Sequence, residues 1–349
     1  MIAAAAAAAL AWGAGGSLSG PASRPGDTAV ARWKGGARAA VSITMDDGYA
    51  SQWRSMPALL ASRGFAGTFF VVTEWIEAEG LWPRWREVAE AGHEIGSHGH
   101  THAPFTRLSP AQLAEEMAGS RRRIQEALGP AHGRTLAYPQ SSASRSLAQA
   151  AARAGYEAAR TGGTAFNPAT PDDLFRVESL HPVSGTPLHE MNLWVDEIRS
   201  RGGWLVVGVH GIADPDRPSS PTQEGWEPIP LERYVAFVDH IAAAGSDLWV
   251  APFGEVARYV RARDAAAAAA AGPVSAREIV VLLRGEEGGP PLTLETAVPD
   301  GWAEVRVETA GGGEAVLPAR RDGGVRKVLY AAAAPARVRL TPAALAAVP

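Results

Sequence analysis

The chain has 349 residues, 46% of them hydrophobic and 7% aromatic, which is enough to bury the core of one large domain plus a small one, or of two medium-sized domains. The formal net charge is −4 and no basic stretch stands out, so nothing suggests a nucleic-acid partner. The absence of cysteine excludes disulfides and thiolate metal sites, so any metal ion must be held by nitrogen and oxygen ligands.

The N-terminus begins with an apolar, alanine-rich run. Residues 2–10 resemble the apolar part of a secretory signal, and small residues at 11–16 offer a cleavage site, although no lysine or arginine precedes the run. We interpret residues 1–36 as a signal-like or disordered segment and linker. A signal predicts a secreted, periplasmic or cell-surface protein, and its absence a cytoplasmic one. No other apolar stretch of the sequence has membrane-spanning length.

Residues 37–263 alternate between strand-like and helix-like segments. The strand-like segments are short and apolar or β-branched, and lie at 39–44, 67–73, 94–97, 135–138, 156–161, 204–209 and 248–251. The helix-like segments lie at 51–63, 82–92, 109–128, 144–154, 188–201, 231–244 and 253–271. This alternation predicts a parallel sheet, and seven strands favour a closed or nearly closed barrel, a distorted (β/α)7-type α/β fold.

The last part of the chain has a different composition. Seven alanines at 265–271, followed by Gly272-Pro273, indicate a helix end and a linker at 264–273. Residues 274–349 then contain short alternating or β-branched segments between glycine-rich turns, which predicts a small β-sandwich-like domain. Because this region holds no cluster of titratable groups, we expect it to support the barrel or to contact carbohydrate.

Ionisable residues follow several of the predicted strands. Asp46 and Asp47 come after the first strand, a histidine-rich stretch from His98 to His102 after the third, and His210 after the sixth. In parallel barrels the catalytic groups sit at the carboxyl ends of the strands. These groups are therefore expected to meet at one end of the barrel.

Imidazoles and carboxylates together are a preferred ligand set of zinc and similar ions. His98 and His102 are four residues apart, the spacing that places two imidazoles on one face of a helical turn. The adjacent Asp46 and Asp47 repel each other unless a cation is near, so we expect one to bind metal and the other to stay free as a base. A solvated Asp-Asp-Gly turn is the alternative, which the histidine cluster disfavours.

Two other classes of histidine site fit less well. The His-x-His pair of amidohydrolase barrels is expected on the first strand with its aspartate late in the chain, the reverse of the order here. A zincin helix needs glutamate directly after the first histidine, where Gly99 stands. We expect His100 to face away from the metal and His93 to have no catalytic role.

Four stretches together resemble the motifs of the polysaccharide deacetylases, the NodB-homology carbohydrate esterases. Thr44-Met45-Asp46-Asp47-Gly48 looks like the family's Thr-Phe-Asp-Asp-Gly, and residues 92–102 look like its second motif. Val207-Gly208-Val209-His210 is similar to its late Leu-x-x-His motif, and residues 247–256 with Tyr259 also look familial. The resemblance covers roughly residues 39–263.

The resemblance implies a reaction and a role for each residue. Asp46 would be the general base, and His210 the general acid. The metal ligands would be Asp47, His98 and His102. The implied reaction is hydrolysis of N- or O-linked acetyl groups of an acetylated polysaccharide, with one divalent transition ion, zinc first, and cobalt, manganese or nickel as alternatives.

The third motif departs from the family. Its Arg-x-Pro-Tyr aligns with Ala137-Tyr138-Pro139-Gln140, so the arginine that orients the base is missing. The resemblance places Tyr138 and Gln140 at the substrate, with a backbone N–H near Gln140 at the oxyanion. Arg160 is our candidate for the missing arginine, with a surface or structural ion-pair role as the alternative. The acidic partner of His210 stays open among Asp172, Asp173 and Asp196.

A protein of another class also fits part of the pattern. A carbohydrate-binding protein on a decayed deacetylase scaffold would explain the missing arginine. Binding alone would not need the retained carboxylates and imidazoles, so we favour an enzyme. Four tryptophans either line a sugar groove or belong to the core: Trp194, Trp204, Trp226 and Trp249.

Overall fold

The computed structural model describes residues 24–216, 224–272, 274–310, 313–322 and 324–343. The predicted signal run at residues 2–10 lies outside these ranges. The described residues form two compact units, one made of residues 33–265 with 288–291 and the other of the remaining described residues. No helix in the described ranges is long and apolar enough to cross a membrane.

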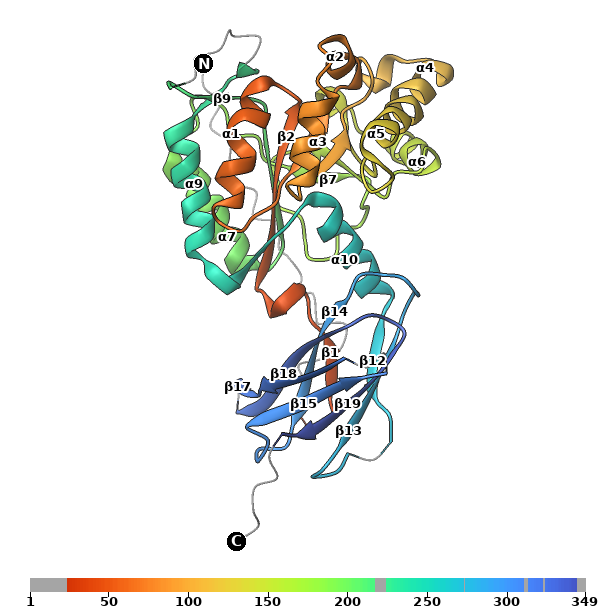
Figure 1. Ribbon diagram of the computed structural model, residues 1–349, viewed down its shortest axis with the longest axis vertical. Coiled ribbons are helices and arrows are strands. Elements are labelled where there is room, and N and C mark those ends of the chain that lie inside the picture. Colours follow the sequence, from red (N-terminus) through yellow and green to blue (C-terminus); the bar gives the residue numbers. More distant parts are fainter. Residues whose placement is uncertain (1–23, 217–223, 273, 311–312, 323, 344–349) are drawn as a thin grey trace. The chain divides into compact units, whose positions relative to one another are not determined.

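Seven parallel strands form the nearly closed barrel of the larger unit (Figure 1). In sheet order they are β2 (Ala39–Asp47), β3 (Thr68–Val71), β4 (Glu94–Ser97), β5 (Thr135–Ala137), β6 (Ala158–Gly162), β7 (Val177–Ser179) and β8 (Trp204–Val209). β8 returns to pair with β2, and a parallel bridge between Leu180 and Val207 links the end of β7 to β8. The predicted barrel is confirmed.

The last predicted barrel strand has a different place. β11 (Leu248–Val250) pairs with residues 39–41 of β2, on the edge that β3 occupies from Thr44 onwards. The strand that completes the circuit is instead β7, which the sequence analysis missed. β7 is only three residues long and carries Glu178 at its centre, so it gives no recognisable strand pattern.

Helices lie around the barrel (Figure 1). They are α1 (Ala50–Ala61), α2 (Thr73–Ala78), α3 (Trp82–Glu90), α4 (Pro110–Ala114), α5 (Ser120–Leu128), α6 (Arg145–Arg153), α7 (Leu188–Arg201), α9 (Leu231–Ala243) and α10 (Phe253–Ala265). The helix predicted over 109–128 contains one wide turn, η3 (Glu115–Gly119), between α4 and α5. It starts with a capping box, in which Ser109 Oγ accepts the N–H of Gln112 and the Gln112 side chain accepts the N–H of Ser109.

Packing in the core holds the end of β2 in a fixed position. All nine residues of β2 are buried, and its apolar side chains pack with those of the helices around it. Trp204 is fully buried and stacks on Phe253 at 5.1 Å between ring centroids, so it belongs to the core, whereas Trp226 is 56% exposed. Because both faces of β2 are held by packing, the two carboxylates at its end have a fixed position.

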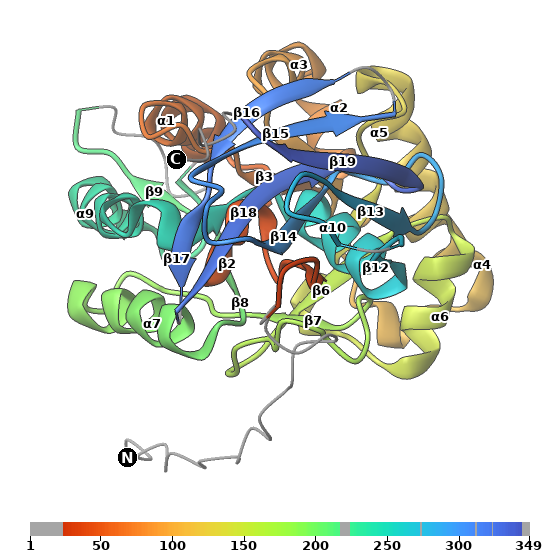
Figure 2. The same cartoon turned by 90° about the horizontal axis from the view of Figure 1, so that it is seen from below.

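The smaller unit consists of two antiparallel sheets, so the predicted C-terminal β-rich region is confirmed (Figure 2). One sheet has the order β1 (Thr28–Val30), β14 (Leu292–Val298), β18 (Val325–Ala332) and β17 (Arg320–Asp322). The other has the order β12 (Ala267–Ala270), β13 (Ile279–Arg284), β19 (Ala336–Pro342), β15 (Glu304–Thr309) and β16 (Glu314–Pro318).

Two predicted boundaries of this unit are wrong. Helix α10 ends at Ala265 rather than Ala271, because four of the alanines form strand β12 against β13. Alanine has the highest helix propensity, and here pairing with a neighbouring strand overrides it. β1 likewise occupies part of the predicted N-terminal linker and pairs with β14.

Candidate active site

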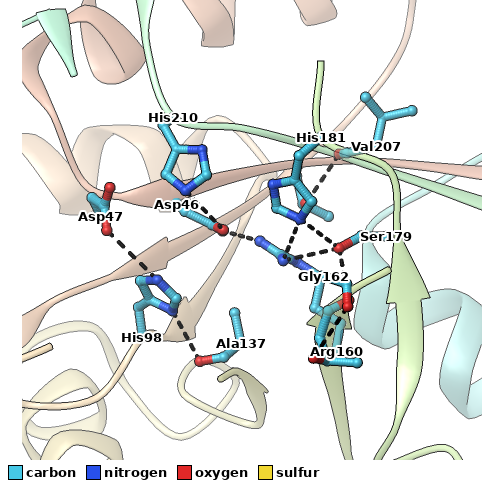
Figure 3. A network of polar contacts seen from close by, with 12 residues as sticks. Asp46, Asp47, His98, Ala137, Arg160, Gly162, Ser179, His181, Val207 and His210 are labelled. Carbon is cyan, nitrogen blue, oxygen red and sulfur yellow. Dashed lines mark hydrogen bonds and ion pairs between the residues drawn. The ribbon is translucent and has the colours of Figure 1, made fainter. Parts of the chain in front are cut away.

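The predicted aspartates, His98, Arg160 and His210 meet at the carboxyl ends of the barrel strands (Figure 3). Asp46 and Asp47 end β2, His98 directly follows β4, Arg160 lies in β6 and His210 directly follows β8. Both aspartates are buried, with exposed fractions of 2% and 4%. At Asp47 the backbone leaves the extended conformation, with φ 80°. For a residue other than glycine this is an uncommon, strained geometry that tends to persist at functional sites.

Asp47 faces two imidazoles. The Nε2 atoms of His98 and His102 each lie 3.5 Å from Asp47 Oδ1. That oxygen is buried and has no hydrogen-bond partner among the described residues. Burial lowers the pKa of His98 to about 3, so its imidazole is neutral, and Nδ1 donates to the carbonyl oxygen of Ala137 at 2.9 Å. This bond leaves the lone pair of Nε2 on the side of Asp47.

These three side chains fit a divalent transition ion. A buried carboxylate oxygen without a partner and two imidazole nitrogens are the donor types that such ions prefer. Burial, and then the charge of Asp46, raise the pKa of Asp47 to about 8. A cation among the three donors would offset both effects.

The two histidines do not share a helical turn, so that part of the prediction is wrong. Residues 98–104 form an irregular loop in which Gly99 and His102 have φ angles of 81° and 66°. The imidazoles of His98 and His102 nevertheless come together, with 4.9 Å between their ring centroids. His100 lies elsewhere, with Nδ1 3.0 Å from Thr73 Oγ1.

Asp46 faces an arginine instead. Its Oδ1 accepts a hydrogen bond from Nη2 of Arg160, which is only 2% exposed. The guanidinium also lies 4.9 Å from the ring centroid of Phe70 and donates from Nη1 to Ser179 Oγ at 3.1 Å. Burial alone would raise the pKa of Asp46, but the charge of Arg160 and the nearby imidazoles hold it well below its usual range. Arg160 is therefore not a surface residue.

His181 was missed by the sequence analysis. Its Nε2 lies 2.8 Å from Ser179 Oγ and 3.3 Å from Arg160 Nη1, and its ring lies 5.4 Å from that of His210 (Figure 3). A Cβ atom at Gly208 would lie 2.5 Å from His181 Cε1, so glycine there leaves room for the ring. Recognition of β7 would have placed this histidine at a strand end, beside the others.

The carboxylate nearest His210 is Asp46 itself, with 3.9 Å between Asp46 Oδ2 and His210 Nε2. None of the three aspartates proposed as its partner fills that place. Asp196 pairs with His240, Asp173 accepts the N–H of Phe175, and no contact in the described part of the chain joins Asp172 to His210.

A second set of possible metal donors consists of Asp46, His181 and His210. Arg160 already places a fixed positive charge on Asp46 and within 3.3 Å of His181 Nε2. A metal ion at this set would meet that charge in a buried, poorly screened position. Of the two sets, the one around Asp47 is therefore the better suited to a cation.

The third-motif residues have different positions from those expected. The phenol of Tyr138 is buried in a hydrophobic cluster with Phe105, and its backbone N–H donates to the carbonyl oxygen of Arg160. In this structure both groups are directed into the protein, and a substrate role for Tyr138 stays a prediction. Gln140 is exposed and has φ 52° in the turn η4 (Pro139–Ser141). The role of its backbone N–H stays a prediction.

Known proteins resemble parts of this chain in sequence and in fold. A family model described as polysaccharide deacetylase matches residues 34–159. A Mycobacterium smegmatis crystal structure assigned to the polysaccharide deacetylases has 19% identity and a TM-score of 0.51, covering 69% of this chain and 94% of that one. The peptidoglycan N-acetylglucosamine deacetylase Bc1960 has 15% identity and a TM-score of 0.45, covering 61% and 86%.

A curated relative is the gellan lyase of a Bacillus species, 27% identical over 325 residues. The alignment covers 85% of this chain but only 12% of the lyase, so the chain spans about an eighth of that relative's length. The family model covers β2 and β4, whose ends carry the paired carboxylates and His98. Residues 34–159 thus match the polysaccharide deacetylase family model, and the fold is similar to that of a protein assigned to this family.

Proposed function

We propose that this chain hydrolyses N- or O-linked acetyl groups of an acetylated polysaccharide, with a divalent transition ion, zinc first, held by Asp47, His98 and His102. The observation that carries the proposal is the contrast between two adjacent buried carboxylates. Asp46 is paired with Arg160, whereas Asp47 Oδ1 faces two imidazole nitrogens and has no hydrogen-bond partner among the described residues. A general base must stay ionised, which an adjacent arginine favours, whereas a metal ligand needs a free oxygen beside other donor atoms.

When bound, the ion supplies a Lewis acid that polarises the acetyl carbonyl and makes water more acidic. Asp46, kept ionised by Arg160, accepts the proton of the attacking water. His210 donates a proton to the leaving nitrogen or oxygen. Since Asp46 Oδ2 and His210 Nε2 are 3.9 Å apart, the group that accepts a proton lies beside the group that gives one.

Arg160 takes the part of the arginine missing from the third motif. It comes from β6, the strand next to β5, and reaches the same carboxylate. Arg160 donates from Nη2 to Asp46 and from Nη1 to Ser179. These two hydrogen bonds fix the guanidinium, which in turn holds the carboxylate of Asp46 in one orientation. This replacement weakens the case for a decayed, non-catalytic scaffold, because the one motif change that favoured such a scaffold has a substitute.

We also propose that the protein is exported, on the basis of the apolar N-terminal run alone. Exposure to extracellular or cell-wall glycans would follow from export. Cell fractionation of a C-terminally tagged chain tests this proposal, and a cytoplasmic, full-length product would contradict it.

The proposed reaction is tested by acetate release from a panel of N-acetylated and O-acetylated glycans. The panel includes acetylated gellan, because a relative is a gellan lyase. We expect release from one class of glycan, its loss after chelation and its return when Zn²⁺, Co²⁺, Mn²⁺ or Ni²⁺ is added. A protein that binds metal but releases acetate from no glycan would contradict the proposal.

A further inference from the structure

The loop between the two predicted histidine ligands needs support from outside. Residues 98–102 belong to no helix, and Gly99 and His102 lie in the left-handed region with φ 81° and 66°. For histidine that conformation is unfavourable in isolation and persists only when the surroundings enforce it. The position of His102 relative to Asp47 therefore depends on what holds this loop.

One buried carboxylate holds the loop. Glu116, which is 5% exposed, accepts the N–H of His100 at 2.7 Å, the N–H of Thr101 at 3.0 and 3.2 Å, and the hydroxyl of Thr101. Three donor groups of two consecutive residues are thus hydrogen-bonded to one side chain. The two oxygens of a carboxylate together offer about four acceptor positions, so one side chain can accept all of these bonds.

Other contacts of the loop come from the same helix and from α2, whose first two N–H groups donate to the carbonyl oxygens of Gly99 and His100 at 3.3 and 2.9 Å. Ser97 Oγ accepts the N–H of Gly99 at 3.1 Å and is itself 2.8 Å from Ser120 Oγ. A Cβ atom at Gly99 would lie 2.8 Å from Glu116 Oε2, so glycine lets the loop approach the carboxylate. The helix segment 116–120 and the loop 97–101 therefore fit together closely.

The wide turn η3 is what makes Glu116 different from its neighbour. Such turns are rare, and they occur frequently at functional sites. Within it Glu116 is buried against the loop, whereas Glu115 is exposed and pairs with Arg123 at 2.7 Å. The turn also leaves the carbonyl of Met117 to accept the hydroxyl of Tyr156 at 2.7 Å. The irregular helix is thus stabilised from both sides.

We propose that Glu116 is a positioning residue for the metal site, which holds residues 99–102 so that His102 stands next to His98 and Asp47. The proposal rests on the proposed function in one respect, that a metal ion binds these three side chains. Residues that orient metal ligands typically affect affinity by about 10- to 100-fold when they are replaced. We expect an effect of that size here, together with an altered geometry at the ion.

The test uses the full chain, stripped of metal, with the variants E116Q and E115Q. Glutamine keeps the shape of glutamate, but its amide NH₂ would face a loop donor instead of accepting from it. Zn²⁺ affinity is measured by competition with a chromophoric chelator, and the visible absorption of bound Co²⁺ reports the ligand geometry. We expect E116Q to weaken Zn²⁺ binding about 10- to 100-fold and to change the Co²⁺ spectrum, with E115Q matching wild type.

A folded E116Q variant with wild-type Zn²⁺ affinity and Co²⁺ spectrum would overturn the proposal. If E116Q does not fold, T101V decides the question, because it removes one of the three donors and leaves Glu116 in place. We then expect weaker Zn²⁺ binding than wild type, and unchanged binding would count against the proposal. A wild-type chain that binds neither ion would contradict the proposed function instead.

Discussion

Asp46 and Asp47 are neighbours in the sequence and equally buried, but the chain surrounds them differently. Asp46 forms an ion pair with Arg160, whereas Asp47 lies beside two neutral imidazoles. The pKa of the first is held below its usual range, and burial raises the pKa of the second to about 8. The difference shows how one Asp-Asp pair can supply both a base that stays ionised and a carboxylate whose ionised form a bound cation would stabilise.

The largest effect should come from Asp46. In D46N the side chain still accepts from Arg160 but no longer accepts a proton from water. Since general-base catalysis contributes about 10²- to 10⁴-fold, we expect kcat to fall by that factor with saturating zinc. The rate of acetate release at a saturating concentration of one glycan measures kcat. A kcat within a few-fold of wild type would remove Asp46 from the role of base.

Arg160 should come next. In R160K a single ammonium group replaces the planar fork that binds Asp46 and Ser179. Misplacement of a catalytic group can cost about 10²-fold, so we expect kcat to fall by about that much while KM and zinc affinity change little. Steady-state kinetics with parallel zinc titration separates these quantities. A loss of zinc affinity instead would mean that Arg160 supports the Asp47 side of the pair.

His181 should have a smaller effect through Arg160. H181Q retains an amide group near the position of Nε2, whereas H181L removes it. His181 Nε2 lies 2.8 Å from Ser179 Oγ, which accepts from Arg160, and a neutral hydrogen bond of this kind is worth about 0.5–1.5 kcal/mol, or up to about tenfold in rate. We expect H181L to lower kcat by up to that factor and H181Q to restore most of it. Equal activity of the two variants would show that the contact at Nε2 is not used.

Tyr138 should have the smallest effect. Its hydroxyl is buried without a hydrogen-bond partner among the described residues, and it lies among apolar side chains. Replacing such a group by an apolar one is close to neutral, so we expect Y138F to keep kcat and KM and to be at least as stable as wild type. A large rise in KM would support a substrate role for Tyr138.

The sequence predicts the barrel and the paired carboxylates well, because both depend on local signals. Buried parallel strands are apolar runs, and the carboxylates directly follow one of them. The partners of Asp46 are less predictable. Arg160 was singled out only because the usual arginine was missing, and His181 was missed together with β7, whose three residues carry no apolar pattern.

Glu116 could not be found from the sequence for a different reason. Residues 109–128 have a continuous helical pattern, and nothing in it indicates that one turn is wide. The burial of Glu116 follows from that turn and from the left-handed loop beside it, which are both tertiary features. The strand of four alanines, β12, is a similar case, since pairing overrides local propensity there.

The different roles of Asp46 and Asp47 are tested most directly by titrating zinc into metal-free D46N and D47N and measuring the binding by calorimetry. If Asp47 is the ligand and Asp46 the base, D46N binds one Zn²⁺ per chain with an affinity close to wild type, and D47N loses most of that affinity. The reverse pattern, with zinc bound by D47N and not by D46N, would contradict the assignment of both carboxylates.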